Sequence, residues 1–235
     1  MRLDKYITET HNIQSRNKAA ELIKANKVQV NNKTINKPSF PIEGDEIIKI
    51  NEEDFFVSRS AYKLKYFIDD NNITIENKSA IDIGSSTGGF TQILLTHNVK
   101  SVTCVDVGTN QLHDSIKNDK RITIAENTDI RKFISDTNYD LVTCDVSFIS
   151  ILNILKDIDR LSSNEIIILY KPQFEVGKDA KRDSNGVVLD TQAILIEREN
   201  FIKETEKLNW NFILSNESKL AGKSGNIEEL FYFKK

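Results

Sequence analysis

Short apolar runs alternate with amphipathic segments from residue 58 to the end of the chain. In the first amphipathic segment, Ala61, Leu64 and Phe67 lie on one face of a helix that would begin at residue 58. Strands that alternate with helices predict an α/β fold, in which a mostly parallel sheet carries helices on both faces. The apolar runs predict seven strands, at residues 80–83, 101–106, 122–125, 140–144, 165–170, 210–216 and 229–233.

The first 50 residues show a shorter pattern of helix and strand. Ser15 is a favourable N-cap, and Ala19 and Leu22 follow it at helical spacing. Asn31 and Asn32 form a turn signal between two short apolar runs, which predicts a hairpin. The expected elements are a helix at 2–9, a second helix from the cap at 15 to about 26, and strands at 28–30, 33–35 and 46–50. We therefore predict a small α+β domain at 1–50, an acidic linker at 51–57 and the α/β domain at 58–235.

The segment 80–91, AIDIGSSTGGFT, joins the first strand of the larger domain to a helix. Its apolar run contains a carboxylate, and small residues with glycines at 84, 88 and 89 form the turn. The next apolar run is followed by Asp106, an acid placed to hold ribose hydroxyl groups. The glycine spacing G-x-x-x-G-G differs from the G-x-G-x-x-G of dinucleotide folds. This pattern predicts a Rossmann-like site for S-adenosylmethionine, and therefore methyl transfer.

Each strand end supplies a candidate contact to this cofactor. Glycine would let the backbone approach the methionine part, and Asp82 would receive its ammonium group directly or through water. Asp106 suits the ribose diol. Asp129 is placed to accept from the adenine amino group, although a helix cap is a simpler reading. The candidate cofactor residues are Asp82, Gly84, Ser85, Ser86, Thr87, Gly88, Gly89, Phe90, Asp106, Val107, Asp129 and Asp145.

The methyl acceptor is indicated by the residues after the fourth strand, DVSF at 145–148. They lack the Asn/Asp-Pro-Pro-aromatic loop that holds a planar amine. Carbon-5 methylation of a pyrimidine needs a cysteine nucleophile. Cys104 and Cys144 both lie inside apolar runs and are interpreted as reduced core residues with no metal or catalytic role. A hydroxyl acceptor remains.

A ribose 2′-hydroxyl is a weak acid and needs a base to attack a methyl carbon. A lysine can act as that base where nearby positive charge favours its neutral amine. Carboxylates would then orient the lysines. Simpler readings exist, in which Lys63 is a solvated helix residue and Glu228 a surface acid. The candidate catalytic residues are Lys63, Asp145, Lys171 and Glu228.

Charge separates the two ends of the chain, although the net charge is only −3. Residues 1–42 hold eight Lys or Arg against three acids, so the remaining 193 residues carry a net charge of −8. A basic first domain suggests a module that binds a polyanion, and a helix N-terminus beside Arg16 and Lys18 suggests a phosphate site. The candidate RNA-binding residues are Arg2, Lys5, Arg16, Lys18, Lys24 and Lys27.

Localisation follows from what the sequence lacks. The chain has no run of 18 apolar residues, and its amino terminus lacks the apolar core of a signal peptide. We expect a cytoplasmic protein with no membrane association and no stable protein partner. No strongly basic amphipathic helix supports membrane lysis.

Two resemblances join these observations. RLDKYI, SRNKAAELIKANKVQVNNK and PIEGDEI resemble the RNA-binding module named after ribosomal protein S4. The larger domain resembles the TlyA family of ribosomal RNA 2′-O-methyltransferases, whose catalytic domain is of the FtsJ type. The resemblance lies in SRSAYKL, the glycine loop at 84–89, DVSFIS, KPQFEVGK and SGNIEE. Such sheets usually include one antiparallel strand, which would be 229–233. The family's Lys-Asp-Lys-Glu tetrad maps by motif onto the four candidate catalytic residues.

The resemblance also implies a substrate. Members of this family methylate a cytidine ribose in 23S rRNA, and longer members also one in 16S rRNA. This chain is similar to the short form, which implies 23S rRNA and the large ribosomal subunit. Ser85 and Asp129 stand where the family often has alanine and asparagine. Both differences concern the cofactor pocket, and neither changes the expected activity.

Two questions stay open at this point. The polar segment 176–190 is either a disordered surface loop or a lid that contacts RNA. The alternative function is a non-catalytic RNA-binding or ribosome-assembly factor that retains the methyltransferase scaffold. Degenerate glycines or a missing tetrad member would favour that alternative, and the sequence has neither.

Overall fold

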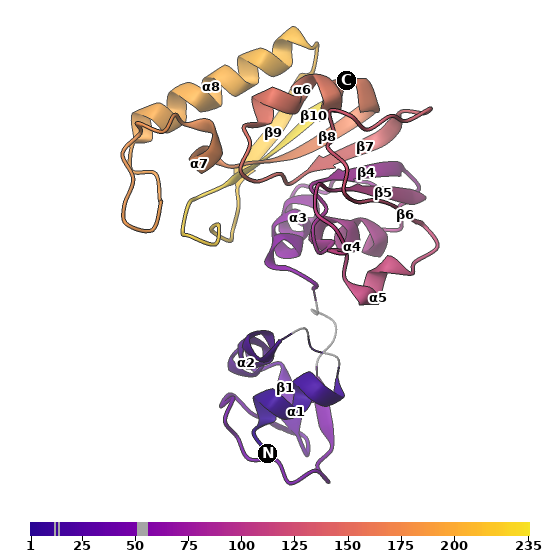
Figure 1. Cartoon of the computed structure of the whole chain (residues 1–235), viewed down its shortest axis with the longest axis vertical. Coiled ribbons are helices and arrows are strands. Elements are labelled where there is room, and N and C mark those ends of the chain that lie inside the picture. Colours follow the sequence, from indigo (N-terminus) through magenta and orange to yellow (C-terminus); the bar gives the residue numbers. More distant parts are fainter. Residues whose placement is uncertain (12, 14, 51–55) are drawn as a thin grey trace. The chain divides into compact units, whose positions relative to one another are not determined.

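The computed structural model describes residues 1–11, 13, 15–50 and 56–235. Its contacts divide the chain into two compact units, Met1–Phe55 and Phe56–Lys235, whose elements are drawn in Figure 1. Of the predicted linker at 51–57, residues 51–55 lie outside the described part of the chain. Phe56 and Val57 are buried and pack into the core of the larger unit.

The smaller unit has two helices and a three-stranded antiparallel sheet of order β2-β1-β3. Ser15 caps the second helix as predicted, since its hydroxyl accepts from the Lys18 backbone N–H at 3.2 Å. Asn31 and Asn32 adopt left-handed φ angles of +49° and +63°, which asparagine tolerates and which a tight hairpin requires. The elements are α1 (Leu3–Thr10), α2 (Arg16–Lys24), β1 (Val28–Val30), β2 (Lys33–Thr34) and β3 (Ile48–Ile50).

The larger unit is built on a seven-stranded sheet of order β6-β5-β4-β7-β8-β10-β9. The first five strands of that order are parallel, and β10 pairs antiparallel with both β8 and β9. The α/β fold, the seven strands and the antiparallel last strand are therefore confirmed. The strands are β4 (Ser79–Ile83), β5 (Ser101–Val105), β6 (Ile122–Ala125), β7 (Tyr139–Cys144), β8 (Ser162–Tyr170), β9 (Asn211–Glu217) and β10 (Glu229–Lys234).

Helices cover both faces of this sheet. Because alternate strand residues point to opposite sides, each strand contributes to the core on both faces. Ala80 and Leu141 face a cluster that includes α3 and α4, whereas Ile81 and Val142 face a cluster that includes α6 and α8. In Figure 1, α8 runs along the outer side of β9 and β10. The helices are α3 (Arg59–Asp70), α4 (Gly89–Thr96), α5 (Asp114–Lys117), the 3-10 helix η2 (Ile151–Ile154), α6 (Leu155–Leu161), α7 (Pro172–Glu175) and α8 (Thr191–Lys207).

The strand order reverses beside β4, which pairs with β5 on one side and with β7 on the other. Chain connections leave in opposite directions at such a point, and the crevice between them is where α/β sheets bind ligands. Gly84 follows β4 at this place with a φ of +78°. A Cβ on Gly84 would lie 2.9 Å from the Asp145 carbonyl oxygen, so glycine lets β4 and β7 end side by side.

Candidate active site

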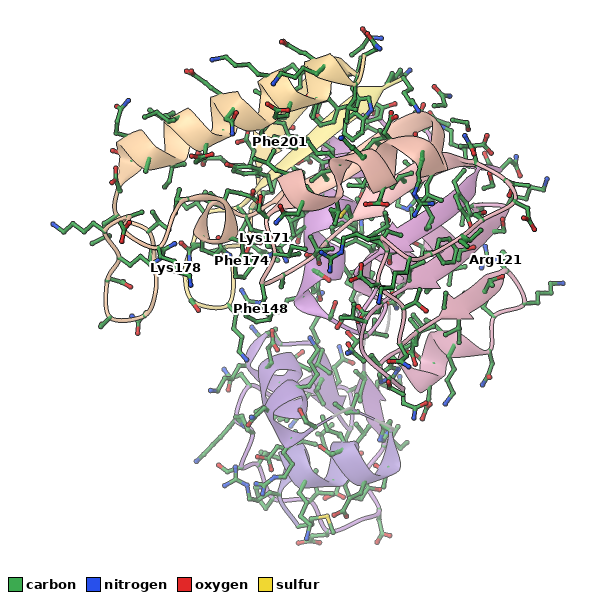
Figure 2. The ribbon with its side chains drawn as sticks, turned by 45° about the horizontal axis from the view of Figure 1, so that its top comes forward. Arg121, Phe148, Lys171, Phe174, Lys178 and Phe201 are labelled. Carbon is green, nitrogen blue, oxygen red and sulfur yellow. The ribbon has the colours of Figure 1, made fainter. Side chains whose placement is uncertain are left out.

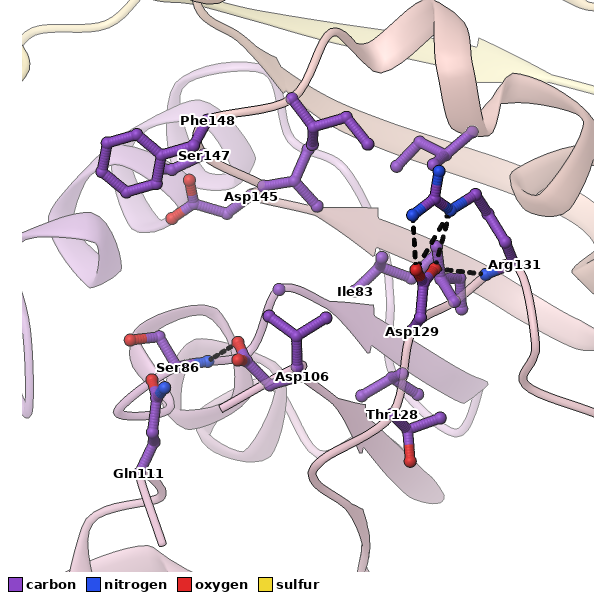
Figure 3. Close-up of a pocket in the computed structure, with 17 residues that line it drawn as sticks. Ile83, Ser86, Asp106, Gln111, Thr128, Asp129, Arg131, Asp145, Ser147 and Phe148 are labelled. Carbon is purple, nitrogen blue, oxygen red and sulfur yellow. Dashed lines mark hydrogen bonds and ion pairs between the residues drawn. The ribbon is translucent and has the colours of Figure 1, made fainter. Parts of the chain in front are cut away.

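A cavity of about 450 Å³ opens at the carboxyl ends of β4, β5 and β7. We call it the cofactor pocket; Figure 3 shows it. Apolar side chains of Val105, Ile130 and Ile154 line much of its wall. Its polar lining residues include Ser86, Asp106, Gln111, Thr128, Asp129, Arg131, Asp145 and Ser147.

Asp106 directly follows β5 and lines this pocket. One of its oxygens accepts from the Ser86 backbone N–H at 2.8 Å and the other from the Gly108 N–H at 2.7 Å. Each carboxylate oxygen can accept more than one hydrogen bond, so the group keeps capacity for a diol. The backbone bonds fix the carboxylate between the glycine loop and the loop after β5.

Asp129 also lines the pocket, paired with Arg131. The Arg131 guanidinium and backbone N–H donate to its carboxylate and lower the pKa of Asp129 to about 2. The bond from the Arg131 backbone N–H, at 3.0 Å, closes a local turn at Asp129. None of the described helices begins there, so the helix-cap reading is wrong. The predicted contact to adenine stays a prediction, and an arginine that the sequence reasoning missed lies beside it.

Asp82 is placed differently from the other candidate acids. It is fully buried and accepts from the Thr91 and Thr143 hydroxyls at 2.6 Å and 2.9 Å. Among the pockets described here, none is lined by Asp82. Its carboxylate therefore ties α4 and β7 to β4 from behind the pocket wall. The predicted contact to the cofactor's ammonium group, directly or through water, stays a prediction.

The glycine loop borders a smaller cavity of about 190 Å³ through Gly84, Ser85, Ser86, Thr87 and Phe90. Gly88 and Gly89 do not line it, and both serve packing within the protein. A Cβ on Gly89 would collide with the hydroxyls of Ser58 and Ser60 at the start of α3. The close approach that demands glycine is therefore between α4 and α3 at this position.

All four candidate catalytic residues line a third cavity, of about 710 Å³, which we call the acceptor pocket. Lys171 Nζ lies 2.6 Å from Asp145 Oδ1 and donates to the Ser147 hydroxyl at 2.8 Å. Lys63 donates to Glu228 Oε2. The four side chains are each at most 15% exposed, so neither lysine is a solvated surface residue.

The cofactor pocket and the acceptor pocket adjoin, because Asp145, Ser147 and Phe148 line both. Burial raises the pKa of Asp145, and the positive charge of Lys171 opposes that shift. Phe148 is 92% exposed, has a φ of +66°, and its ring centroid lies 5.3 Å from that of Phe174. Both residues are labelled in Figure 2. A left-handed φ is unusual for a bulky residue and is often found at functional sites. Sequence reasoning missed this aromatic pair, although both members flank the tetrad motifs.

The segment 176–190 has a defined course beside the acceptor pocket. The Arg182 guanidinium donates to the carbonyl oxygens of Gln173, Val176, Gly177, Lys178 and Ala180. Asn226 ties the segment to the loop before β10, since its side chain accepts from Val188 N–H at 3.0 Å. Arg182, Asn185 and Gly186 line the pocket, which favours the reading of this segment as a loop that covers the acceptor site.

Three of the predicted RNA-binding residues, Arg2, Arg16 and Lys24, line one hollow of about 530 Å³ in the smaller unit. Asp4 holds the two arginines, pairing with Arg2 at 2.7 Å and with Arg16 at 3.4 Å. The other three do not line this hollow. These three are Lys5, which pairs with Glu9, Lys18, which pairs with Glu21, and Lys27.

Comparisons with known proteins agree with the division into two units. Residues 1–48 match the S4 domain, and residues 56–235 match the FtsJ-like methyltransferase family. A "23S rRNA (cytidine-2'-O)-methyltransferase TlyA" from Campylobacter jejuni is 45% identical over 99% of both chains. A "16S/23S rRNA (cytidine-2'-O)-methyltransferase TlyA" from Mycobacterium tuberculosis is 33% identical over 99% of this chain and 89% of that protein.

A solved structure from Streptococcus thermophilus matches 100% of this chain and 88% of its own, with 29% identity and a TM-score of 0.73. None of the helices that the structure describes has the length and apolar character of a membrane span. The relatives named above match both units together. The chain therefore belongs to the TlyA family of methyltransferases, in which an S4 domain accompanies an FtsJ-like domain.

Proposed function

We propose that this protein transfers a methyl group from S-adenosylmethionine to the 2′-hydroxyl of a cytidine ribose in ribosomal RNA, with 23S rRNA as the substrate. The observation that carries this proposal is the pair of buried ion pairs, Lys171–Asp145 and Lys63–Glu228, in a pocket that adjoins the cofactor pocket. The name and the full-length similarity of the Campylobacter relative support the substrate.

The residues present fit S-adenosylmethionine. The apolar wall of the cofactor pocket suits an adenine ring, and the carboxylate of Asp106 suits a ribose diol. The smaller cavity at the glycine loop is lined by six hydroxyl side chains, three of them from the loop itself, and suits the polar methionine end. When bound, this molecule supplies a methyl group made electrophilic by a positively charged sulfur.

Lys171 is the proposed general base. In its neutral form its amine would accept the proton of the 2′-hydroxyl as the ribose oxygen attacks. Asp145 and Ser147 hold Nζ at 2.6 Å and 2.8 Å, so the amine has a fixed position at the junction of the two pockets. Fixed positioning of base and acceptor accounts for a large part of the rate in such reactions.

Lys63 and Glu228 form the second pair of the site and would orient the ribose. Lys63 lies on α3 and Glu228 is the residue before β10, so the pair joins two segments that are distant in the sequence at the acceptor pocket. A lysine that stays charged there also stabilises negative charge that develops on the attacking oxygen.

The S4 unit is proposed to hold structured RNA through phosphates, with the Arg2, Arg16 and Lys24 hollow as its principal contact. We assign the RNA-binding domain to residues 1–50 and the catalytic domain to residues 56–235, two residues earlier than predicted, because Phe56 and Val57 belong to its core. The large ribosomal subunit is the proposed partner and the cytoplasm the proposed location.

Replacing Lys171 tests the reaction. Lys171→Ala should abolish ribose methylation and leave RNA binding nearly intact. Because an unpaired buried Asp145 also costs stability, Lys171→Arg is the sharper variant. Arginine keeps the charge and cannot release its proton, so activity should fall at least about 100-fold in a folded protein.

Methyl transfer to 23S rRNA, with the modified ribose mapped by resistance to alkaline cleavage, measures the result. Lys156→Arg, the same change at an exposed site on α6, is the matched control and should keep full activity. Full activity of Lys171→Arg would refute Lys171 as the base. A methyl group found on a nucleobase would refute the ribose as the acceptor.

A further inference from the structure

The two ion pairs of the acceptor pocket come from four separate parts of the chain. Lys63 lies on α3, Asp145 follows β7, Lys171 follows β8, and Glu228 precedes β10. Each pair is held internally, but a reaction that uses both needs them in register with each other. Among the hydrogen bonds of the described residues, the side chain of Gln173 links the Lys171 segment to Glu228.

Gln173 reaches Glu228 from the short helix α7, two residues after Lys171. Its Nε2 donates to Glu228 Oε1 at 3.0 Å, while Lys63 occupies Oε2. Since an ionised carboxylate only accepts, this contact fixes which end of the amide faces Glu228. Lys171 is the N-cap of α7, so Gln173 and Lys171 belong to one helical turn. Figure 2 labels Lys171 and Phe174 of this turn.

The loop before β10 also lies against the carboxylate of Glu228, at the oxygen that Gln173 binds. A Cβ on Gly222 would lie 2.5 Å from Glu228 Oε1, so that loop passes directly against the carboxylate. The Glu228 side chain is only 4% exposed. The carboxylate is therefore held by Lys63, Gln173 and the close backbone at Gly222, with little room to change its direction.

The other end of the Gln173 amide is poorly satisfied. Its Oε1 is buried and has no hydrogen-bond partner among the described residues. A buried carbonyl without a partner costs stability, so an apolar side chain of similar length would suit folding better. The amide at this position is explained by its bond to Glu228, and folding alone does not require it.

Resting on the proposed function, we infer that Gln173 is a positioning residue of the methyl-transfer site. It aligns the Lys63–Glu228 pair with the Lys171–Asp145 pair and so sets the ribose against the base. The inference also explains why the position holds an amide. A glutamate there would face Glu228 with a second buried carboxylate, and one of the two would have to bind a proton.

Two substitutions test this role, with Gln192→Met on the exposed start of α8 as the matched control. Gln173→Met keeps the length and removes the hydrogen bond. We expect its kcat for ribose methylation to fall about ten- to a hundredfold, with KM for RNA and for S-adenosylmethionine within about twofold of the wild type. Its melting temperature should stay equal to the wild type or rise. The control should match the wild type in all four measurements.

Gln173→Glu adds a signature that a structural role would not produce. Once protonated, the new carboxyl group can donate to Glu228 as the amide does, so the ratio of its kcat to that of the wild type should rise as pH falls from about 8 to about 6. Its melting temperature relative to the wild type should rise over the same range. The sign follows because the folded protein binds this proton more tightly than the unfolded chain.

The outcomes separate the two proposals. A wild-type kcat in Gln173→Met, or a fall in kcat together with a lower melting temperature, would overturn the positioning role. A pH-independent ratio for Gln173→Glu would also overturn it. If the wild type does not methylate the ribose, the proposed function fails instead, and with it this role. The melting curves of Gln173→Glu would then still show whether residue 173 faces Glu228.

Discussion

Asp82 shows how a single residue at a strand end can differ from its neighbours. Asp106 and Asp145 line pockets, whereas Asp82 is fully buried behind them. Burial raises its pKa to about 6, because hydrogen bonds from Thr91 and Thr143 only partly replace the lost water. A carboxyl group whose pKa is raised in the folded protein binds its proton more tightly there than in the unfolded chain.

Stability should therefore fall as pH rises through the range between the ordinary pKa of an aspartate and about 6. Asp82→Asn lacks this titration. Its free energy of unfolding, relative to the wild type, should rise by about 3 kcal/mol between about pH 4 and about pH 7, since one pKa unit is worth about 1.4 kcal/mol. Urea unfolding of the cofactor-free protein measures the difference.

Asp140→Asn is the control of opposite sign. Hydrogen bonds from Ser79 lower the pKa of Asp140, so this variant should lose stability relative to the wild type as pH rises through the acid range. A difference for Asp82→Asn that stays flat with pH would show that its carboxyl group is not buried as described.

The same residues show what the sequence can and cannot predict. Acids and glycines at strand ends were identifiable, because the strand pattern and the residue types are local. The depth of Asp82 was not, since it depends on Thr91 and Thr143, which come from two other elements. Likewise, the packing of Gly89 against α3 depends on a helix about 30 positions earlier in the chain.

At the scale of elements, the loop 107–113 forms part of the cofactor pocket and is held from outside it. Glu126, directly after β6, accepts from the backbone N–H groups of Asn110, Gln111 and Leu112 at 2.5, 2.9 and 3.0 Å. These bonds lower the pKa of Glu126, with the bond from Leu112 the largest cause. Glu126 does not line the pocket, whereas Gln111 and Val107 do.

Glu126→Ala should therefore weaken cofactor binding without touching the acceptor site. Three backbone donors would lose their partner, and the loop would have to reorder when the cofactor binds. We expect KM for S-adenosylmethionine to rise about tenfold, equal to about 1.4 kcal/mol, with kcat and RNA affinity unchanged. Steady-state kinetics with varied cofactor measure this.

Asp114→Ala is the matched control, because Asp114 is an exposed acid on α5 just beyond the same loop. Its KM for the cofactor should equal that of the wild type. An unchanged KM in Glu126→Ala would mean that the loop keeps its shape without this carboxylate.

The segment 176–190 marks the limit of prediction for elements. Its polar, glycine-containing composition is equally typical of disorder and of a functional loop. What orders it is the Arg182 guanidinium on the carbonyl groups at the end of α7, together with Asn226 from a loop near the chain's end. Such long-range contacts have no signature in local composition.

For the whole molecule, the uneven charge corresponds to a division into units. The basic first 42 residues lie in the S4 unit, and the more acidic part of the chain forms the methyltransferase unit. Phosphate contacts release counterions, so each one contributes to the salt dependence of RNA affinity. A unit that supplies most of these contacts should dominate that dependence, whatever happens at the catalytic site.

Among the six candidate RNA-binding residues, Arg16 is the sharpest test of this division. Its guanidinium pairs with Asp4 at 3.4 Å, lines the hollow in the S4 unit and is 55% exposed, so a phosphate can reach it. Arg16→Gln should weaken binding to 23S rRNA and lower the slope of log affinity against log salt by about 1. Lys18→Gln should have a smaller effect, because the Lys18 side chain is 13% exposed and pairs with Glu21. Filter binding over a series of salt concentrations gives both slopes, and an unchanged slope in Arg16→Gln would exclude Arg16 as a phosphate contact.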